Sequence, residues 1–116
     1  MRMFLILLPL LLISLSFQVT TTQFDGVWLP IENIADSHVQ EIGNYAVSEH
    51  NRQSGDNLEF LEVISGERQV VAGKPGMNYL LALKARNANG DVGRYQTEVY
   101  EREWEEYREL KSFFQV

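Results

Sequence analysis

The sequence predicts a single α+β domain in which one helix packs against an antiparallel sheet. Three observations support this fold class: one segment has helical periodicity, several β-prone runs follow it, and a strong turn signal separates two of those runs. The chain has 116 residues, of which 45% are hydrophobic and 22% are charged, as in an ordinary globular protein of one domain.

Residues 1–22 are predicted to be a secretory signal peptide rather than part of this domain. Arg2 precedes an apolar-rich run from Phe4 to Phe17, which is shorter than the roughly 20 residues that a membrane-spanning helix needs. Small residues place the cleavage site between residues 16 and 22. We therefore expect a secreted protein whose domain covers residues 23–116 and which has no membrane segment in its mature form.

Composition argues against several classes of function. Without Arg2 the chain keeps nine of its 10 Lys and Arg against 16 Asp and Glu, and the resulting charge of 9 minus 16, or −7, makes nucleic acid an unexpected partner. The absence of cysteine excludes a disulfide scaffold and a cysteine nucleophile. His50 lies on an apolar helical stripe, which favours a core histidine over a metal ligand. We expect no cofactor, no metal and no enzymatic centre.

The first predicted elements are a short strand and a helix. The run Val27 to Ile31 is β-prone, Pro30 within it restricts it to an edge or a short strand, and Trp28 is expected in the core. Ser37 and Gln40 have the spacing of a capping box, so a helix should begin near Ser37 and end by Ser54-Gly55-Asp56. Apolar residues recur on one face of this helix at intervals of three and four residues. Gly43 within it predicts close approach of a sheet.

Strand candidates follow the helix. Residues 58–72 have a β-like pattern in which neither parity is purely apolar, so the register stays open, and Gly66 within them predicts a bulge. Residues 79–85 form the next candidate. The turn signal Asn87 to Asp91 follows, because Asn and Gly accept positive φ, and residues 92–100 supply the hairpin partner.

The C-terminal segment has two interpretations. Tyr100, Trp104, Tyr107, Leu110 and Phe114 recur at helical spacing, which on periodicity alone favours a helix. However, an antiparallel sheet begun by the preceding hairpin would still need its edge covered, which favours a strand. The residues themselves leave both interpretations open.

An uncharged apolar stretch stands where a polar turn is expected. Gln69-Val70-Val71-Ala72-Gly73 lies between a β-prone run and the breaker Lys74-Pro75-Gly76. Loop tips are usually polar, so this tip is predicted to be a contact surface. The plainer alternative is an ordinary strand end.

This stretch and three other places resemble the plant cystatins, the inhibitors of papain-like cysteine proteases. The pattern Gln-x-Val-x-Gly at residues 69–73 resembles their first inhibitory loop, and Ile42 to Asn51 resembles their helix signature. Gly26 resembles the glycine of their N-terminal trunk, and Trp104 resembles the tryptophan of their second hairpin loop. The matches occur in the family's order and cover the mature chain.

The resemblance implies a cystatin-like fold, an antiparallel sheet wrapped around one long N-terminal helix, with the C-terminal segment as a strand. It implies reversible, competitive occlusion of the active-site cleft of papain-like cysteine proteases, with a role in plant defense. A monomer is expected, and strand exchange to a domain-swapped dimer is the alternative. The residues it assigns to protease contact are Gly26, Gln69, Val70, Val71, Ala72, Gly73 and Trp104.

Besides Asn44, which stands where the helix signature usually has a charged residue, the chain departs from the family pattern in three places. Asp25 stands where plant members often carry a second glycine, Glu103 replaces the proline that usually precedes the tryptophan, and Lys74 to Met77 lengthens the segment after the first loop. These departures favour an alternative function, a non-inhibitory binding or storage module on the cystatin fold.

Overall fold

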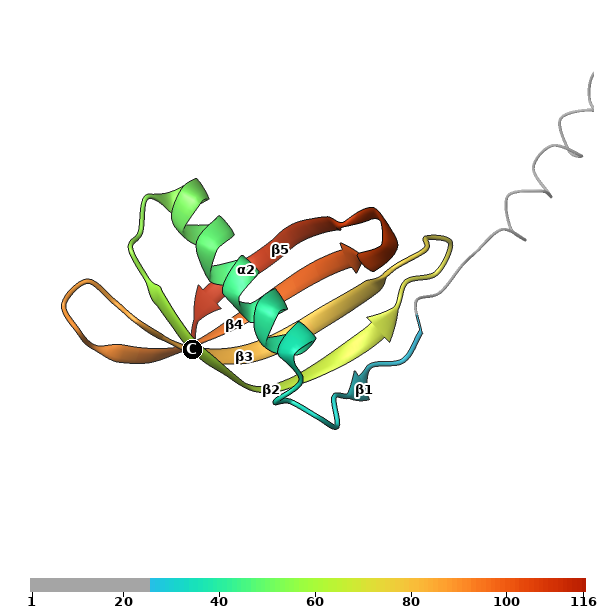
Figure 1. Ribbon diagram of the computed structural model, residues 1–116, viewed down its shortest axis with the longest axis horizontal. Coiled ribbons are helices and arrows are strands. Elements are labelled where there is room, and N and C mark those ends of the chain that lie inside the picture. Colours follow the sequence, from blue (N-terminus) through green and yellow to red (C-terminus); the bar gives the residue numbers. More distant parts are fainter. Residues whose placement is uncertain (1–25) are drawn as a thin grey trace, which may run out of the picture.

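The computed structural model describes residues 26–116, so the predicted signal peptide and Asp25 lie outside the described residues and their roles remain predictions (Figure 1). Within residues 26–116, five antiparallel strands form one sheet in the order β1-β2-β3-β4-β5, and one long helix crosses one face of it. The predicted α+β fold class is confirmed. The elements are β1 (Leu29–Pro30), α2 (Ser37–Ser54), β2 (Glu59–Val70), β3 (Met77–Arg86), β4 (Val92–Arg102), the 3₁₀ turn η2 (Glu103–Glu105) and β5 (Tyr107–Gln115).

Helix α2 begins at Ser37, but the predicted capping box is wrong. The N-cap is Asp36, whose Oδ1 accepts the backbone N–H of His38 at 2.9 Å. Gln40 does not reach back to the cap; its Oε1 accepts the backbone N–H of Val63 on β2 at 2.9 Å. A single sequence pattern cannot separate the two roles, because the strand that Gln40 contacts lies more than 20 residues away.

The end of α2 agrees with the prediction, whereas the assignment of His50 to the core is wrong. Gly55 adopts the left-handed conformation with φ 81° and donates its N–H to the carbonyl of Asn51 at 2.9 Å. His50 is half-buried beside this end. Its Nε2 lies 2.8 Å from Asp56 Oδ2, and its ring stacks on Phe113 of β5 at 4.2 Å.

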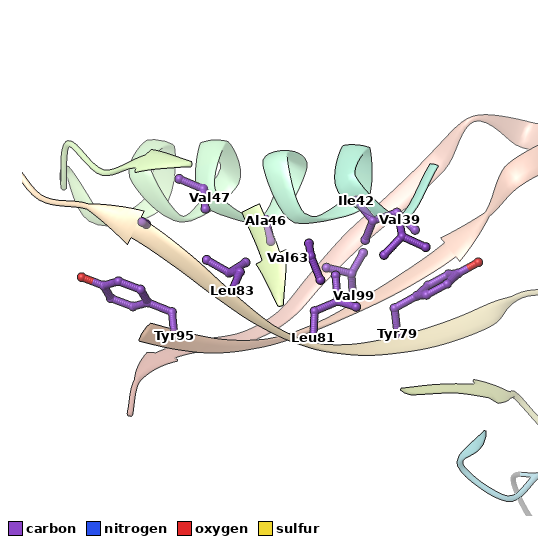
Figure 2. Packing of buried hydrophobic residues seen from close by; sticks show 11 residues of the cluster. Val39, Ile42, Ala46, Val47, Val63, Tyr79, Leu81, Leu83, Tyr95 and Val99 are labelled. Atoms are coloured by element: carbon purple, nitrogen blue, oxygen red, sulfur yellow. The ribbon is translucent and has the colours of Figure 1, made fainter. Parts of the chain in front are cut away.

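The core lies between α2 and the facing side of the sheet (Figure 2). At Gly43 the helix approaches β2 so closely that a Cβ atom would lie 2.5 Å from Val63 Cγ2 and 2.9 Å from Phe60 Cε1. The predicted close approach of the sheet is therefore confirmed. The buried hydrophobic residues of this core are Val39, Ile42, Ala46, Val47, Val63, Tyr79, Leu81, Leu83, Ala85, Tyr95 and Val99.

Two predictions for the strands are wrong. Gly66 pairs in register with Leu81, and the irregularities of β2 lie earlier, between Phe60 and Glu62 and between Val63 and Ser65. Gly66 serves close packing instead, because a Cβ atom there would lie 2.6 Å from Leu81 Cδ2. Trp28 precedes the two-residue edge strand β1, is only partly buried, and is not part of the core.

The C-terminal segment is a strand, so the helical interpretation from periodicity is wrong. β4 continues to Arg102, and β5 returns beside it with Val99 opposite Leu110. Burial of β4 alternates from Tyr95 to Val99, and β5 supplies the backbone partners that the edge of β4 would otherwise lack. The predicted turn is confirmed, since Asn87 Oδ1 accepts the backbone N–H of Asp91 at 2.9 Å.

Candidate functional site

Three segments that are distant in the sequence meet at one end of the sheet (Figure 1). The first loop, residues 71–76, joins β2 to β3, and the second loop, residues 103–106, joins β4 to β5. Both lie at the same end because alternate hairpins of an antiparallel sheet turn at the same side. The backbone N–H of Gly26 donates to the carbonyl of Val70 at 2.9 Å, which brings the start of the described chain to this end. We refer to Gly26, Val70 and the two loops as the binding edge.

Most of the apolar residues predicted for contact are accessible at the binding edge. Val70 is 58% exposed and Trp104 is 63% exposed, while Val71 and Ala72 are partly exposed. Gly73 is exposed and has φ 72°, a conformation that a residue with a Cβ atom rarely adopts. The edge therefore carries apolar surface on both loops.

Sequence reasoning missed two apolar residues beside this edge. Val27 is 72% exposed and Leu29 is 54% exposed. Together with Gly26, Val70 and other residues they line a shallow cavity of about 360 Å³. Pro30 already predicts an edge or short strand here, and apolar side chains on an edge strand can stay exposed, which is the signal that could have added Val27 and Leu29 to the contact residues.

Gln69 differs from the other predicted contact residues because its side chain is buried, with 8% exposure. Its Nε2 donates to the carbonyl of Gly26 at 2.9 Å, and its Oε1 accepts from Nδ2 of Asn78, itself 3% exposed, at 3.0 Å. Gly26 is thus held by hydrogen bonds at both its N–H and its carbonyl. Gln69 lies beneath the edge and fixes the trunk against the first loop.

The second loop is a tight turn that projects Trp104 away from the sheet. Glu106 adopts the left-handed conformation with φ 52° and donates its N–H to the carbonyl of Glu103 at 3.0 Å. Arg102 Nε lies 2.8 Å from Glu105 Oε1, and the guanidinium of Arg102 also lies over the ring of Tyr107 at 4.4 Å. These contacts brace the turn from the inside of the loop.

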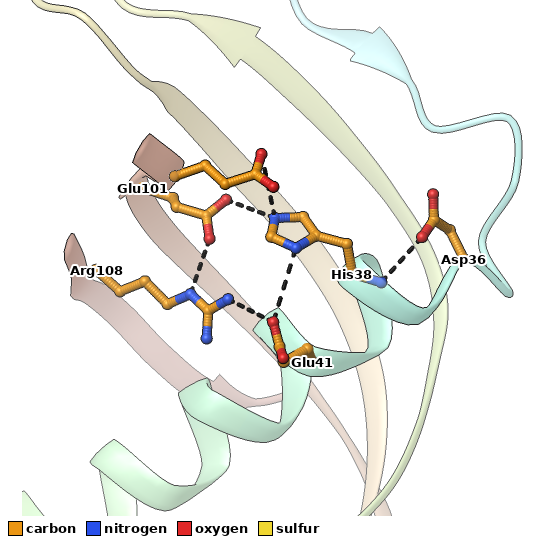
Figure 3. A network of polar contacts seen from close by, with 6 residues as sticks. Asp36, His38, Glu41, Glu101 and Arg108 are labelled. Atoms are coloured by element: carbon orange, nitrogen blue, oxygen red, sulfur yellow. Dashed lines mark hydrogen bonds and ion pairs between the residues drawn. The ribbon is translucent and has the colours of Figure 1, made fainter. Parts of the chain in front are cut away.

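A polar network ties the helix to the strands that carry the second loop (Figure 3). Glu101 is 4% exposed, and its carboxylate accepts from Arg108 Nε at 2.8 Å and lies 2.8 Å from His38 Nε2. Arg108 also donates through Nη2 to Glu41 at 2.7 Å. The hydrogen bond from Arg108, together with its charge, lowers the pKa of Glu41.

The same network contains the described residues that could hold a metal ion. His38, Glu101 and Glu103 each place one ligand atom within 4.8 Å of the others. Both carboxylate oxygens of Glu101 already face a partner, since one meets His38 and the other accepts from Arg108. We therefore assign the cluster the structural role of joining α2 to β4 and β5.

Comparison with known proteins gives a consistent family. A family model described as "Aspartic acid proteinase inhibitor" matches residues 31–116. "Cysteine proteinase inhibitor 6" of Oryza sativa subsp. japonica is 49% identical over 88 residues, which cover 74% of this chain and 75% of the relative. "Cysteine proteinase inhibitor 5" of Arabidopsis thaliana is 40% identical over 110 residues, which cover 95% of this chain and 88% of the relative.

A third relative extends the pattern. "Cysteine proteinase inhibitor 1" of Actinidia chinensis var. chinensis is 42% identical over 91 residues, which cover 78% of this chain and 75% of the relative. These identities lie well above 30% and cover more than two thirds of the chain, and the helix-on-sheet fold is the one that the resemblance implied. The chain belongs to the plant cystatin family.

Proposed function

We propose that this protein is a reversible, competitive inhibitor of papain-like cysteine proteases. The plant relatives are named as cysteine proteinase inhibitors, which supplies the target class. The observation that carries the proposal is the binding edge, where the trunk and both loops present apolar surface at one end of the sheet (Figure 1). On this account the protein occludes a protease cleft and is not itself an enzyme.

Burial of apolar surface at the edge supplies the affinity. Trp104 is 63% exposed in the free protein. A tryptophan that buries roughly 150 Å² contributes about 4 kcal/mol before the costs of association. Val70 and its neighbours in the first loop add a second apolar contact, and Gly73 allows the chain to turn there. Occlusion needs no covalent step. The resemblance to the cystatins implies that neither loop presents a carbonyl to the protease thiolate, so we expect the inhibitor not to be cut.

The contact residues then divide by their position. Gly26, Val70, Val71, Ala72, Gly73 and Trp104 face the protease, whereas buried Gln69 acts through Gly26. This division refines the assignment from sequence, which gave Gln69 a direct contact.

A second target class is suggested by the family model, whose description names aspartic acid proteinases. A non-inhibitory binding or storage module on the same fold is the further alternative, and Glu103 in place of the usual proline is the residue that favours it. Both alternatives predict that the binding edge does not block a papain-like protease.

The deciding experiment is a titration of papain with the purified protein, with hydrolysis of a fluorogenic peptide as the readout. Competitive inhibition is expected, and papain whose active-site cysteine has been carboxymethylated should still bind, because occlusion does not use the thiol. Trp104→Ala should weaken inhibition, whereas Val92→Ala should not; Val92 is also an exposed apolar residue, but it lies at the opposite end of the sheet.

A parallel titration of pepsin tests the second target class. Inhibition of pepsin without inhibition of papain would replace the proposal with the aspartic proteinase function. Inhibition of neither enzyme at micromolar inhibitor would favour the non-inhibitory module.

The site of action follows from the predicted signal peptide. We propose that the protein is secreted and acts as a monomer in plant defense, with control of endogenous proteases as the alternative role. The helix among residues 26–116 is too polar to cross a membrane. Mass determination of the secreted protein would give the cleavage site, which we expect between residues 16 and 22.

A further inference from the structure

Tyr100 is a buried tyrosine near the end of β4, with 4% exposure. Its neighbours Val99 and Glu101 face α2, since Val99 belongs to the core and Glu101 contacts His38. Because successive side chains of a strand point to opposite faces, the ring of Tyr100 lies on the face of the sheet away from the helix. Something other than the helix must therefore cover it.

The first loop supplies part of this cover. The hydroxyl of Tyr100 donates to the carbonyl of Pro75 at 3.0 Å, and the Nζ of Lys74 lies 5.4 Å from the ring centroid. Gly76 packs so closely that a Cβ atom there would lie 2.6 Å from Tyr100 Oη and 2.7 Å from the carbonyl oxygen of Glu101. Lys74 to Gly76, the part of the lengthened segment that precedes β3, therefore folds onto β4.

The same ring also contacts the base of the second loop. Tyr100 meets Tyr107 edge to face, with ring centroids 6.2 Å apart, and the guanidinium of Arg102 lies 5.7 Å from the Tyr100 centroid. Arg102 and Tyr107 are paired across β4 and β5 and flank the turn that projects Trp104. One side chain thus contacts the first loop and the base of the second.

We propose that Tyr100 is a positioning residue that fixes the first loop relative to the second, so that both reach a protease cleft at one preset separation. The proposal rests on the inhibitory function proposed above. Ordering a loop at the moment of binding costs free energy, and a loop already held in place avoids that cost. The hydroxyl is the decisive group, because it is the part of Tyr100 that hydrogen-bonds the loop backbone.

The free protein gives the first test, which does not depend on any protease. Because the chain has no cysteine, nitroxide labels can be placed at Ala72→Cys in the first loop and Glu106→Cys in the second. Pulsed electron spin resonance should show a narrow distribution of distances in the otherwise native protein and a broader one after Tyr100→Phe. Tyr95→Phe is the matched control, since Tyr95 is a tyrosine of the same strand that is 8% exposed and lies far from both loops.

The second test is the inhibition constant for papain, measured without labels. Tyr100→Phe should weaken inhibition about fivefold, the effect of one lost hydrogen bond, whereas Tyr95→Phe should leave it unchanged. Gly76→Ala should weaken inhibition further, because it displaces the segment that Tyr100 holds.

The two measurements separate the possible failures. An unchanged distance distribution after Tyr100→Phe would overturn the proposed tie between the loops. If Tyr100→Phe broadens the distance distribution but leaves the inhibition constant unchanged, the proposed role of Tyr100 in protease binding is overturned. If the unaltered protein does not inhibit papain while its distance distribution is narrow and widens after Tyr100→Phe, the inhibitory function fails and the tie between the loops stands.

Discussion

Replacement of Gln69 by methionine distinguishes support of the trunk from direct contact with a protease. Methionine has a similar size but cannot hydrogen-bond to Gly26 or to Asn78. The bond to Gly26 lies near the surface, where water can replace it. Asn78 is 3% exposed, so its Nδ2 would lose a partner that water does not supply. An orphaned buried polar group costs about 1–3 kcal/mol, and we expect a loss of stability of about 2 kcal/mol, or roughly 10 °C in Tm.

A second substitution separates this loss of stability from the effect on the trunk. Gln69→Met/Asn78→Leu removes both polar partners, and it also removes Asn78 Oδ1, which is buried without a hydrogen-bond partner. Such paired apolar replacements are close to neutral, so Tm should return toward that of the unaltered protein. The hydrogen bond to the Gly26 carbonyl stays absent, so inhibition of papain should remain about fivefold weaker.

Removal of the trunk completes the test. In a protein that begins at Trp28, Gly26 is absent, and Gln69→Met/Asn78→Leu should then have no further effect on the inhibition constant. Inhibition constants from papain titrations and Tm from circular dichroism give the required numbers. If the double substitution weakens inhibition equally with and without the trunk, Gln69 contacts the protease directly and the positioning role is refuted.

Three further substitutions test other parts of the structure. Trp104→Ala should weaken papain inhibition by roughly 30- to 1,000-fold, corresponding to about 2–4 kcal/mol, with little change in Tm because Trp104 is 63% exposed; a large drop in Tm would mean it supports the fold. Gly43→Ala should lower the free energy of unfolding, measured in urea, by about 1–2 kcal/mol, because the cost of overpacking against Val63 exceeds the gain in helix propensity. A variant as stable as the unaltered protein, or more stable, would contradict the close packing of α2 on β2 at this position. The hydrogen bonds that Glu49 accepts from Arg52 lower the pKa of Glu49 to about 2. The contribution of this pair to folding stability is therefore complete above the unfolded pKa of about 4.3 and is lost as the pH falls to about 2. The Tm difference between the unaltered protein and Glu49→Gln should therefore shrink across that interval, and a constant difference would exclude this pair as its source.

The parts of the fold that sequence predicted are those with a local physical signal. Gly55 and the Asn87 to Asp91 turn need conformations that few residues adopt, so their positions fix the end of α2 and the β3–β4 connection. Gly43 predicts a close contact with the sheet, because glycine within a helix otherwise costs stability. In each case the residue type alone indicates the local backbone conformation or the close contact that the structure has.

The errors arise where a partner distant in the sequence decides the outcome. Gln40 matches a capping box, but its Oε1 accepts the backbone N–H of Val63 on β2 instead. The helical spacing between Tyr100 and Phe114 reflects two strands and a turn, because β5 pairs with β4 and covers its edge. The periodicity of one segment carries no information about a neighbouring strand that pairs with it.

The candidate site shows the same division between what is local and what is distant. The accessibility of the apolar tip and of Trp104 could be predicted, since an apolar residue within a turn has few ways to be buried. The burial of Gln69 could not, because it depends on Gly26, which lies 43 residues earlier and carries no signal of its own contact. The sequence therefore predicts the exposed residues of the binding edge, and the structure adds the buried side chain of Gln69, which holds Gly26 in place.

Glu103 in place of the usual proline changes how the second loop is held. Proline would restrict φ before Trp104, and that restriction is absent here. The turn instead has the bond from the Glu106 N–H to the Glu103 carbonyl, and Arg102 bridges it from Glu105 to the ring of Tyr107. A covalent restraint is thus replaced by an ion pair and an aromatic contact that are both close to solvent. Since such pairs are weak individually, we expect the position of Trp104 to depend on the buried ring of Tyr100, which contacts Tyr107 behind them, more than it would in a family member with proline.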